Sequence, residues 1–444
     1  MQTKTVVKMK FANVKCLILS VFIAHVSGSH CVPNPDHARP NVNPIDTQAP
    51  VFVDSTTNGK LYRVGNGEDG FDIVHVWGSP YEMGFAHGKL QKNATLKMAD
   101  AVWEYMEDQI IEAVNGTVTF IPNWFLKDVS NYGLDFALDL EILATERFTG
   151  KYFAEELKGL ADASGADYKK LMRIHMLGEL TKGSCSMLGA WGKSVPTPRS
   201  LLQLRALDWS YDGPFKDHPQ VTVYHPTDSK DGNAFANFGW AAWIGSITGM
   251  SSSQMAISEI GVSYADETFG KESRFGTPFT YLLRDILQFD NSLNDSVNRI
   301  SKAHRTCDLL LGVGDGKTAE FRGIQYSASV ANFYDDTNLQ PLQDWHPRIE
   351  DTVYWGMDWI CPGYNQVLSE QIKKYYGSIT PENVIQNIVS IVQTGNLQVA
   401  VYDLTNGVAY LSNAAATYES GPKYAYERQF VRLDMKALFN EPRP

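Results

Sequence analysis

The residues of this chain best suited to nucleophilic chemistry lie within the segment 183–209. Cys185 opens the segment, and Arg205 and Asp208 follow it by 20 and 23 residues on a second apolar run. We interpret the segment as two strands joined by a proline-containing hairpin, with Cys185 at the start of the first strand. If the chain were cut between Ser184 and Cys185, one residue would carry both a thiol nucleophile and a free α-amine that could act as its base.

The spacing of Arg205 and Asp208 leaves two interpretations open. Residues three apart on a strand point to opposite faces, so both could reach Cys185 only near a strand end or a bulge. Alternatively, Arg205 and Asp208 form a structural ion pair and Cys185 is a small buried apolar residue. Composition and spacing by themselves favour the structural interpretation.

Length and composition indicate a large globular protein. The chain has 444 residues, of which 43% are hydrophobic and 12% aromatic, which suffices for one large domain or two moderate ones. The net charge of -11 argues against nucleic-acid or anionic-membrane partners. The histidines lack metal-ligand spacing and the sequence has no Gly-x-Ser-x-Gly motif, so we expect no metal and no other cofactor. The stretch GVGDGKT (312–318) is one residue short of a P-loop and is interpreted as a turn.

The N-terminal residues indicate export. Residues 1–28 combine four lysines with a short apolar run and a small-residue ending, which is typical of a signal peptide and too short to span a bilayer. No later segment predicts a membrane span. Glycosylation motifs begin at Asn93, Asn115 and Asn294. We therefore expect a glycoprotein of the secretory pathway, either secreted or lysosomal.

Four cysteines remain after removal of the signal peptide. If Cys185 is catalytic, Cys31, Cys307 and Cys361 allow at most one internal disulfide. Our first choice is Cys31 with Cys361, because this bridge would tether a cleaved N-terminal piece to the rest of the chain.

The pattern of elements changes at Cys185. Two short strands precede a helix that we expect to begin after Ser79, which is followed by proline and then by glutamate three residues on, and to continue to about Val114. Gly84 and Gly88 would let another backbone approach this helix. After Cys185 we expect strands in two blocks with helices between them, including a hairpin expected to turn at residues 314–316. Further helices are expected at 132–149, 151–163 and 168–180. The pattern predicts two stacked antiparallel sheets faced by helices, with no linker between domains.

Several of these motifs resemble the N-terminal-nucleophile (Ntn) hydrolases of the group that contains acid ceramidase, choloylglycine hydrolases and acyl-CoA:6-aminopenicillanic acid acyltransferase. Gly-Ser-Cys185-Ser followed by Arg205-Ala-Leu-Asp208-Trp is similar to the group's cysteine and Arg-x-x-Asp strand. GSPYEMGFAHG (78–88) resembles the N-terminal helix motif of the acyltransferase-like members. WIGSITGM (243–250) resembles a turn of the ceramidase-like members.

The resemblance implies an α+β fold, a four-layer αββα sandwich with an N-terminal helical segment. It also implies self-cleavage between Ser184 and Cys185. The products would be a mostly helical piece, 29–184, released by the cut, and a catalytic piece, 185–444. We expect no partner beyond a small acylated substrate, and the sequence does not indicate an oligomeric state.

The resemblance further assigns roles to residues. Cys185 would be the nucleophile, Asp208 would hold the new α-amine, and Arg205 would orient the site and favour the thiolate. Asn332, in VANFYDD, would donate to the oxyanion, although alanine replaces the group's threonine before it. A strand-end asparagine that satisfies a turn is the alternative for Asn332.

The implied function is an amidohydrolase that cleaves a linear amide, such as an N-acyl amine or a lipid amide. An acyltransferase or a phospholipase-B-like esterase with the same thiol is one alternative. A secreted glycoprotein that kept the fold and lost the chemistry is another.

Overall fold

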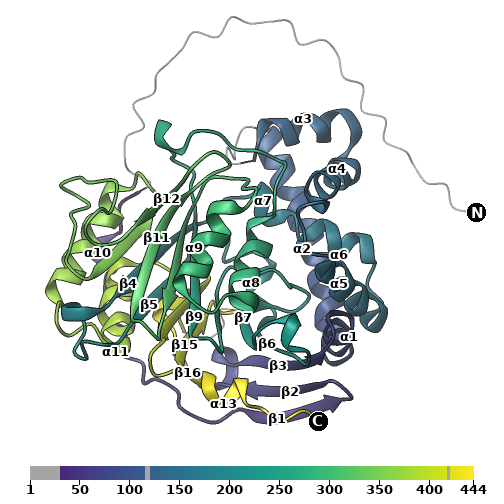
Figure 1. Ribbon diagram of the computed structural model, residues 1–444, viewed down its shortest axis with the longest axis horizontal. Helices are drawn as coiled ribbons and strands as arrows, with labels where there is room; N and C mark the ends of the chain where they lie inside the picture. Colours follow the sequence, from purple (N-terminus) through teal and green to yellow (C-terminus); the bar gives the residue numbers. More distant parts are fainter. Residues whose placement is uncertain (1–30, 116–120, 418–420) are drawn as a thin grey trace, which may run out of the picture.

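Two β-sheets packed face to face form the centre of the molecule (Figure 1). The computed structural model describes residues 31–115, 121–417 and 421–444. Among the described strands, neighbours are antiparallel with one exception, the parallel pair β3 and β6. The sequence expectation of two antiparallel sheets therefore holds for all but this pair. In spatial order, the ten-stranded sheet contains β1 (Val51–Thr56), β2 (Gly59–Val64), β3 (Phe71–Gly78), β6 (Pro219–Pro226), β7 (Phe235–Trp240), β8 (Gly249–Ser251), β9 (Met255–Gly261), β10 (Leu309–Asp315), β11 (Glu320–Tyr326) and β12 (Ala331–Tyr334).

The second sheet carries Cys185, Arg205 and Asp208. Its strands are buried along nearly their whole length, because one face packs on the ten-stranded sheet and the other on helices. In spatial order, the six-stranded sheet contains β13 (Thr352–Met357), β4 (Ser184–Ala190), β5 (Leu202–Asp208), β14 (Gln398–Asp403), β15 (Val408–Asn413) and β16 (Val431–Asp434).

Helices cover the outer face of each sheet and complete the αββα layers. The helices α8 (Phe279–Phe289) and α9 (Leu293–Lys302) lie on the ten-stranded sheet, and α10 (Pro362–Lys374) lies on the six-stranded sheet (Figure 1). Within the described ranges, no helix combines the length and the apolar character needed to cross a membrane. The remaining helices are α1 (Pro80–Leu90), α2 (Lys92–Val114), α3 (Asn123–Tyr132), α4 (Leu134–Glu146), α5 (Lys151–Ser164), α6 (Tyr168–Ile174), α7 (Leu177–Leu180), α11 (Pro381–Asn383), α12 (Ser390–Val392) and α13 (Met435–Phe439).

The helix after Ser79 begins as expected but ends earlier. Ser79 and Glu82 form a capping box, in which the Ser79 backbone N–H donates to Glu82 Oε2 at 2.8 Å. The single helix expected to reach Val114 is wrong, because Gln91 leaves helical geometry with φ of -113° and ψ of 33°. The Gln91 side chain instead donates to Asp72 on β3 at 2.7 Å. This contact anchors the junction between α1 and α2 on the sheet.

Two helices of the N-terminal part meet through glycines. A Cβ placed on Gly84 of α1 would lie 1.9 Å from the carbonyl oxygen of Glu156 on α5. A Cβ on Gly159 of α5 would lie 2.1 Å from the carbonyl oxygen of Tyr81. The close backbone approach expected from Gly84 and Gly88 is therefore present, and α5 is the helix that makes it.

The N-terminal part is built into the same fold as the C-terminal part. It supplies β1, β2 and β3 of the ten-stranded sheet, and β3 pairs directly with β6. Glu156 on α5 also forms a buried ion pair with Arg284 on α8, with 2.5 Å between Oε2 and Nη2. Residues 29–184 are therefore not a separable helical unit. A cut before Cys185 would divide the chain and leave one sheet shared by both pieces.

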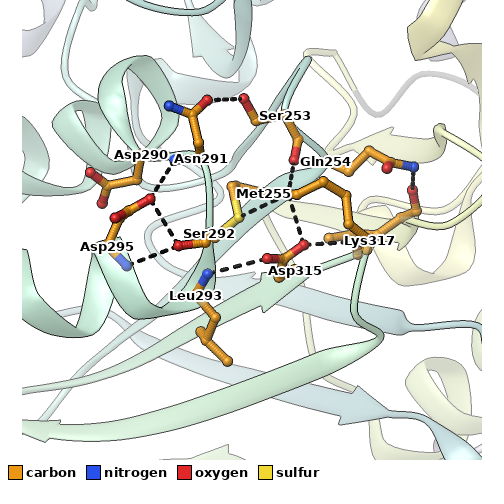
Figure 2. A network of polar contacts seen from close by, with 12 residues as sticks. Ser253, Gln254, Met255, Asp290, Asn291, Ser292, Leu293, Asp295, Asp315 and Lys317 are labelled. Carbon is orange, nitrogen blue, oxygen red and sulfur yellow. Dashed lines mark hydrogen bonds and ion pairs between the residues drawn. The ribbon is translucent and has the colours of Figure 1, made fainter.

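The glycine-rich stretch 312–318 contains the end of β10, and its Asp315 binds the first residue of α9. The hairpin turns at residues 316–319, slightly later than expected, since Asp315 still pairs with Glu320. Figure 2 shows the polar network at this turn, in which the buried Asp315 accepts the backbone N–H of Leu293 at 3.2 Å and pairs with Lys317 at 2.8 Å. Lys317 thus forms an ion pair with Asp315, which fits the interpretation of this stretch as a turn.

We expect Gly84→Ala to destabilise the protein, because the added methyl group would force α1 and α5 apart. The free energy of unfolding should fall by about 2 kcal/mol, the usual cost of overpacking a core contact. Lys89→Ala on the exposed face of α1 is the matched control and should leave stability unchanged. Chemical denaturation of both variants measures the difference, and equal stability would contradict the close packing of α1 on α5.

Candidate active site

Cys185 lies near the start of a central strand, completely buried. It is the second residue of β4 and pairs with Leu207 on β5 and with Met357 on β13. Its side chain is 0% exposed, and burial raises the pKa of the thiol well above its usual value, although the nearby Arg205 opposes this shift. In the continuous chain the thiol is therefore neutral and closed to solvent.

The thiol and Arg205 point into the space between the two sheets. Met187, two residues after Cys185, faces the ten-stranded sheet, since a Cβ on Gly312 would lie 3.0 Å from its sulfur. Arg205 pairs with Met187 in register, so it shares this face. Its guanidinium forms an ion pair with Glu259 on β9, with 3.2 Å between Nη2 and Oε2. The pair joins the two sheets beside Cys185.

Glu259 is a site residue that the sequence analysis missed. Its side chain is 8% exposed, and burial raises the pKa of its carboxyl, while Arg205 lowers it. The signal was a single carboxylate within the apolar strand MAISEIG, where a charge has to find a partner.

Asp208 ends β5 and points to the opposite face of the sheet from Arg205. Its carboxylate accepts hydrogen bonds from the Thr394 hydroxyl at 2.6 Å, from Gly395 N at 2.8 Å and from Asn396 N at 3.0 Å. Burial raises the pKa of Asp208 to about 6, while these three donors lower it. Gly395 has φ of 87°, a conformation that favours glycine and aims its N–H at the carboxylate.

The segment Thr394–Asn396 was also missed, because its residues read as an ordinary turn. Thr394 Oγ1 lies 2.6 Å from Ser186 Oγ as well as from Asp208 Oδ2. A hydroxyl has one hydrogen, so Ser186 can donate to Thr394 while Thr394 donates to Asp208. This arrangement connects the residue after Cys185 with the carboxylate.

The register of β4 and β5 determines whether Arg205 and Asp208 lie near the thiol or near the nitrogen of Cys185. Ser184 pairs with Asp208, so the start of β4 coincides with the end of β5, which is the strand-end condition set by the spacing. The side chains of Arg205 and Asp208 nevertheless lie on opposite faces. The thiol shares the face of Arg205, whereas the Cys185 nitrogen belongs to the backbone between the two faces. An α-amine at this nitrogen could therefore approach Asp208 without moving the thiol.

Asn332 does not share this site. It lies on the edge strand β12, where its exposed side chain donates to Gln325 Oε1 at 2.9 Å. Gly261 at the end of β9 and Ala331 at the start of β12 are in register, with one residue each of β10 and β11 between them. These three strand spacings separate Gly261 from Ala331 by about 14 Å. The described contacts join Asn332 to Gln325 and not to Cys185. The contact with Gln325 fits the alternative of a structural asparagine, and Asn332 as the oxyanion donor stays a prediction.

The remaining residues predicted from the sequence are three cysteines and the three sequon asparagines. Cys31 and Cys361 form the expected disulfide, which joins the N-terminal segment to the start of α10, and Cys307 is a free buried thiol. Exposed side chains are found at all three sequon asparagines, Asn93, Asn115 and Asn294. The signal peptide expected at 1–28 and the motif residues after Asn115 lie outside the described residues.

Comparisons with known proteins find full-length similarity to two proteins of Dictyostelium discoideum. Protein dcd1A is 34% identical over 98% of this chain and 99% of its own length. Protein dcd1B is 35% identical over 90% of this chain and 81% of its own length. Among solved structures, the Caenorhabditis elegans N-acylethanolamine-hydrolyzing acid amidase ortholog is 15% identical with a TM-score of 0.37, over 50% of this chain and 93% of that one. No family model matches the chain.

We expect Glu259→Met to leave the buried Arg205 charge without a partner. The free energy of unfolding should fall by about 3 kcal/mol, because an unpaired buried guanidinium is costly. The double variant Arg205→Met/Glu259→Met removes both charges and should recover most of the loss. Urea denaturation of the single and double variants measures the coupling, and a single variant as stable as the wild type would show that the pair is not needed between the sheets.

Proposed function

The chain belongs to the family that contains the Dictyostelium proteins dcd1A and dcd1B, and we propose that it is an N-terminal-nucleophile amidohydrolase. The observation that carries the proposal is the start of β4, where Cys185 has Arg205 on the face of its thiol. Asp208 lies level with the preceding residue, Ser184. A thiol and an amine on one residue fit this arrangement, because the two flanking charges lie on opposite faces of the strand.

The first step of the proposal is a cut of the chain by its own thiol. The Cys185 sulfur attacks the carbonyl carbon of Ser184, the C–N bond of that peptide breaks, and the thiol proton passes to the departing nitrogen. Water then hydrolyses the resulting thioester. This leaves a carboxylate on Ser184 and restores the thiol on Cys185, which now carries a free α-amine.

The new amine supplies the base that the buried thiol lacks. An α-amine has an ordinary pKa of about 8, so a larger share of it is free to accept a proton near neutral pH than of a lysine, which is already protonated because its pKa is about 10.4. Asp208 stabilises the ammonium form of this amine. Arg205 attracts the thiolate on the other face, against the effect of burial on the thiol pKa.

In the substrate reaction, the Cys185 thiolate attacks the amide carbon and the α-ammonium gives its proton to the leaving amine. A C–S bond replaces the C–N bond, and water hydrolyses the acyl thioester to a carboxylic acid. Cys185 thus supplies both the nucleophile and the proton donor, while Arg205 stabilises its thiolate and Asp208 stabilises its ammonium group.

Aromatic side chains beside Asp208 support a substrate with an apolar acyl group. Trp209 stacks on Phe215 with 4.7 Å between ring centres, and Tyr105 meets Trp209 edge-on at 6.3 Å. An acyl group that entered beside Asp208 would meet these apolar rings, which favour an apolar group over a charged one. We therefore propose N-acyl amines or lipid amides as the substrate class.

We expect the mature protein to run as two fragments under reducing conditions, of about 17 and about 29 kDa before glycan mass, from typical residue masses. Cys185→Ala should remain one chain, because it lacks the nucleophile. Edman degradation of the larger fragment should begin at Cys185. The fragments should co-migrate until the Cys31–Cys361 disulfide is reduced. A wild-type chain that stays whole, with Cys185 never terminal, would contradict the proposal.

The cut protein should then hydrolyse long-chain N-acyl amines with release of the free amine, and the uncut Cys185→Ala form should not. Matched esters and added acceptor amines test the other reactions open to the same thiol. Hydrolysis of the ester only, or transfer to the added amine, would replace the amidohydrolase assignment.

We also propose that the protein enters the secretory pathway. The Cys31–Cys361 disulfide and the exposed sequon asparagines support this compartment. Enzymatic removal of N-glycans should lower the mass of both fragments, since Asn93 and Asn115 precede Cys185 and Asn294 follows it. Asn294→Gln should abolish the shift of the larger fragment and leave that of the smaller one. A protein whose mass does not change on deglycosylation would contradict this localisation.

A further inference from the structure

A largely buried lysine precedes the proposed cut and is tied to a carboxylate of another segment. Lys182 Nζ lies 2.6 Å from Glu272 Oε1, and the lysine side chain is 15% exposed. We propose that Lys182 and Glu272 are positioning residues for self-cleavage, which hold the Ser184 carbonyl within reach of the Cys185 thiol. This inference rests on the proposed function and adds to it the contact that sets the geometry of the cut.

Glu272 is itself fixed, so it can serve as an anchor. It lies in the segment between β9 and α8, and its Oε1 also accepts the backbone N–H of Asp308 at 3.2 Å. The next residue, Ser273, donates its backbone N–H to Thr306 O at 3.0 Å. The carboxylate is therefore fixed against the segment that leads into β10, and Lys182 reaches from the N-terminal part to this point.

The backbone between Lys182 and the cut is held as closely as the side chain. A Cβ on Gly261, at the end of β9, would lie 2.8 Å from Gly183 O and 3.1 Å from Lys182 Cα. On its other side, a Cβ on Gly183 would lie 3.5 Å from the carbonyl oxygen of Asp208. Gly183 thus runs between the ends of β9 and β5, with contact on both sides.

The segment is also fixed at its N-terminal end. Thr181 donates to Leu177 O from both its backbone N–H and its hydroxyl, each at 2.9 Å, which ends α7. Ser184 is already in register with Asp208. Only Lys182 and Gly183 lie between the fixed residues Thr181 and Ser184. Of these two, Lys182 is the one whose side chain binds another segment, through Glu272.

The charge of Lys182 is maintained by its surroundings. Burial lowers the pKa of Lys182, but Glu272 more than offsets it, so the pKa is raised overall, with Asp308 also contributing. Asp358 lies within electrostatic range, since Lys182 opposes the burial that raises the Asp358 pKa to about 6. Loss of the lysine charge would therefore free the segment and leave these carboxylates without their cation.

Positioning acts on the rate of an intramolecular reaction. Attack of the sulfur on the carbonyl needs the two atoms at near-contact distance, and small displacements lower the rate steeply. We expect Lys182→Met to slow the conversion of full-length chain to fragments about tenfold. The charge-swapped variant Lys182→Glu/Glu272→Lys should recover most of the rate. Lys60→Met is the matched control, because Lys60 on β2 is also 15% exposed and forms an ion pair with Glu441 at 2.7 Å.

The experiment is a pulse-chase of the full chain in secretory cells, with the loss of the full-length band as readout. The uncut background Cys185→Ala is purified with and without Lys182→Met, and thermal unfolding of the two forms measures the stability lost when Glu272 has no partner. Cleavage of Lys182→Met at the wild-type rate would overturn the inference. It is also overturned if the charge swap fails to restore the rate while Lys182→Met lowers the unfolding temperature, because the pair then acts on stability alone.

The test separates this inference from the proposed function. Wild-type cleavage combined with an unaffected Lys182→Met rate overturns only the role of the ion pair. A wild-type chain that is never cut removes both.

Discussion

Arg205 carries a permanent charge into the space between two sheets, and its partner Glu259 comes from the opposite sheet. Neither group could be buried there without the other, since an isolated guanidinium in an apolar interior costs several kcal/mol. The two sheets must therefore stack so that β5 faces β9. Cys185 lies beside this contact, so the surroundings of its thiol follow from the packing of the sandwich.

The geometry of the site follows from the two faces of one strand. The thiol of Cys185 lies on the side of Arg205, and the Asp208 carboxylate lies on the other side with its own set of backbone donors. A base carried by a second side chain would have to enter one of these two packed layers. An amine on the backbone of Cys185 avoids this requirement, because the main chain lies between both faces.

A cut before Cys185 would leave the fold continuous. The strands β1 to β3 belong to the ten-stranded sheet, and the glycine contacts of α1 with α5 and the Glu156–Arg284 pair pack both parts together. The Cys31–Cys361 disulfide adds a covalent connection across the same division. The two pieces of a cut chain would therefore be subunits of one core.

Local patterns in the sequence determined much of the fold. The capping box at Ser79, the glycine spacing on α1 and the strand-forming runs after Cys185 each act over a few residues, so they can be recognised without tertiary contacts. The Cys–Arg–Asp spacing likewise identified the strand pair that carries the site. Only the tertiary structure decided that Glu259 completes the pair with Arg205 and that the Thr394–Asn396 segment binds Asp208. The same holds for Asn332, which lies on the edge strand β12 and contacts Gln325. These contacts depend on which strand ends meet, and strand order between distant segments is set by sheet packing, not by neighbouring residues.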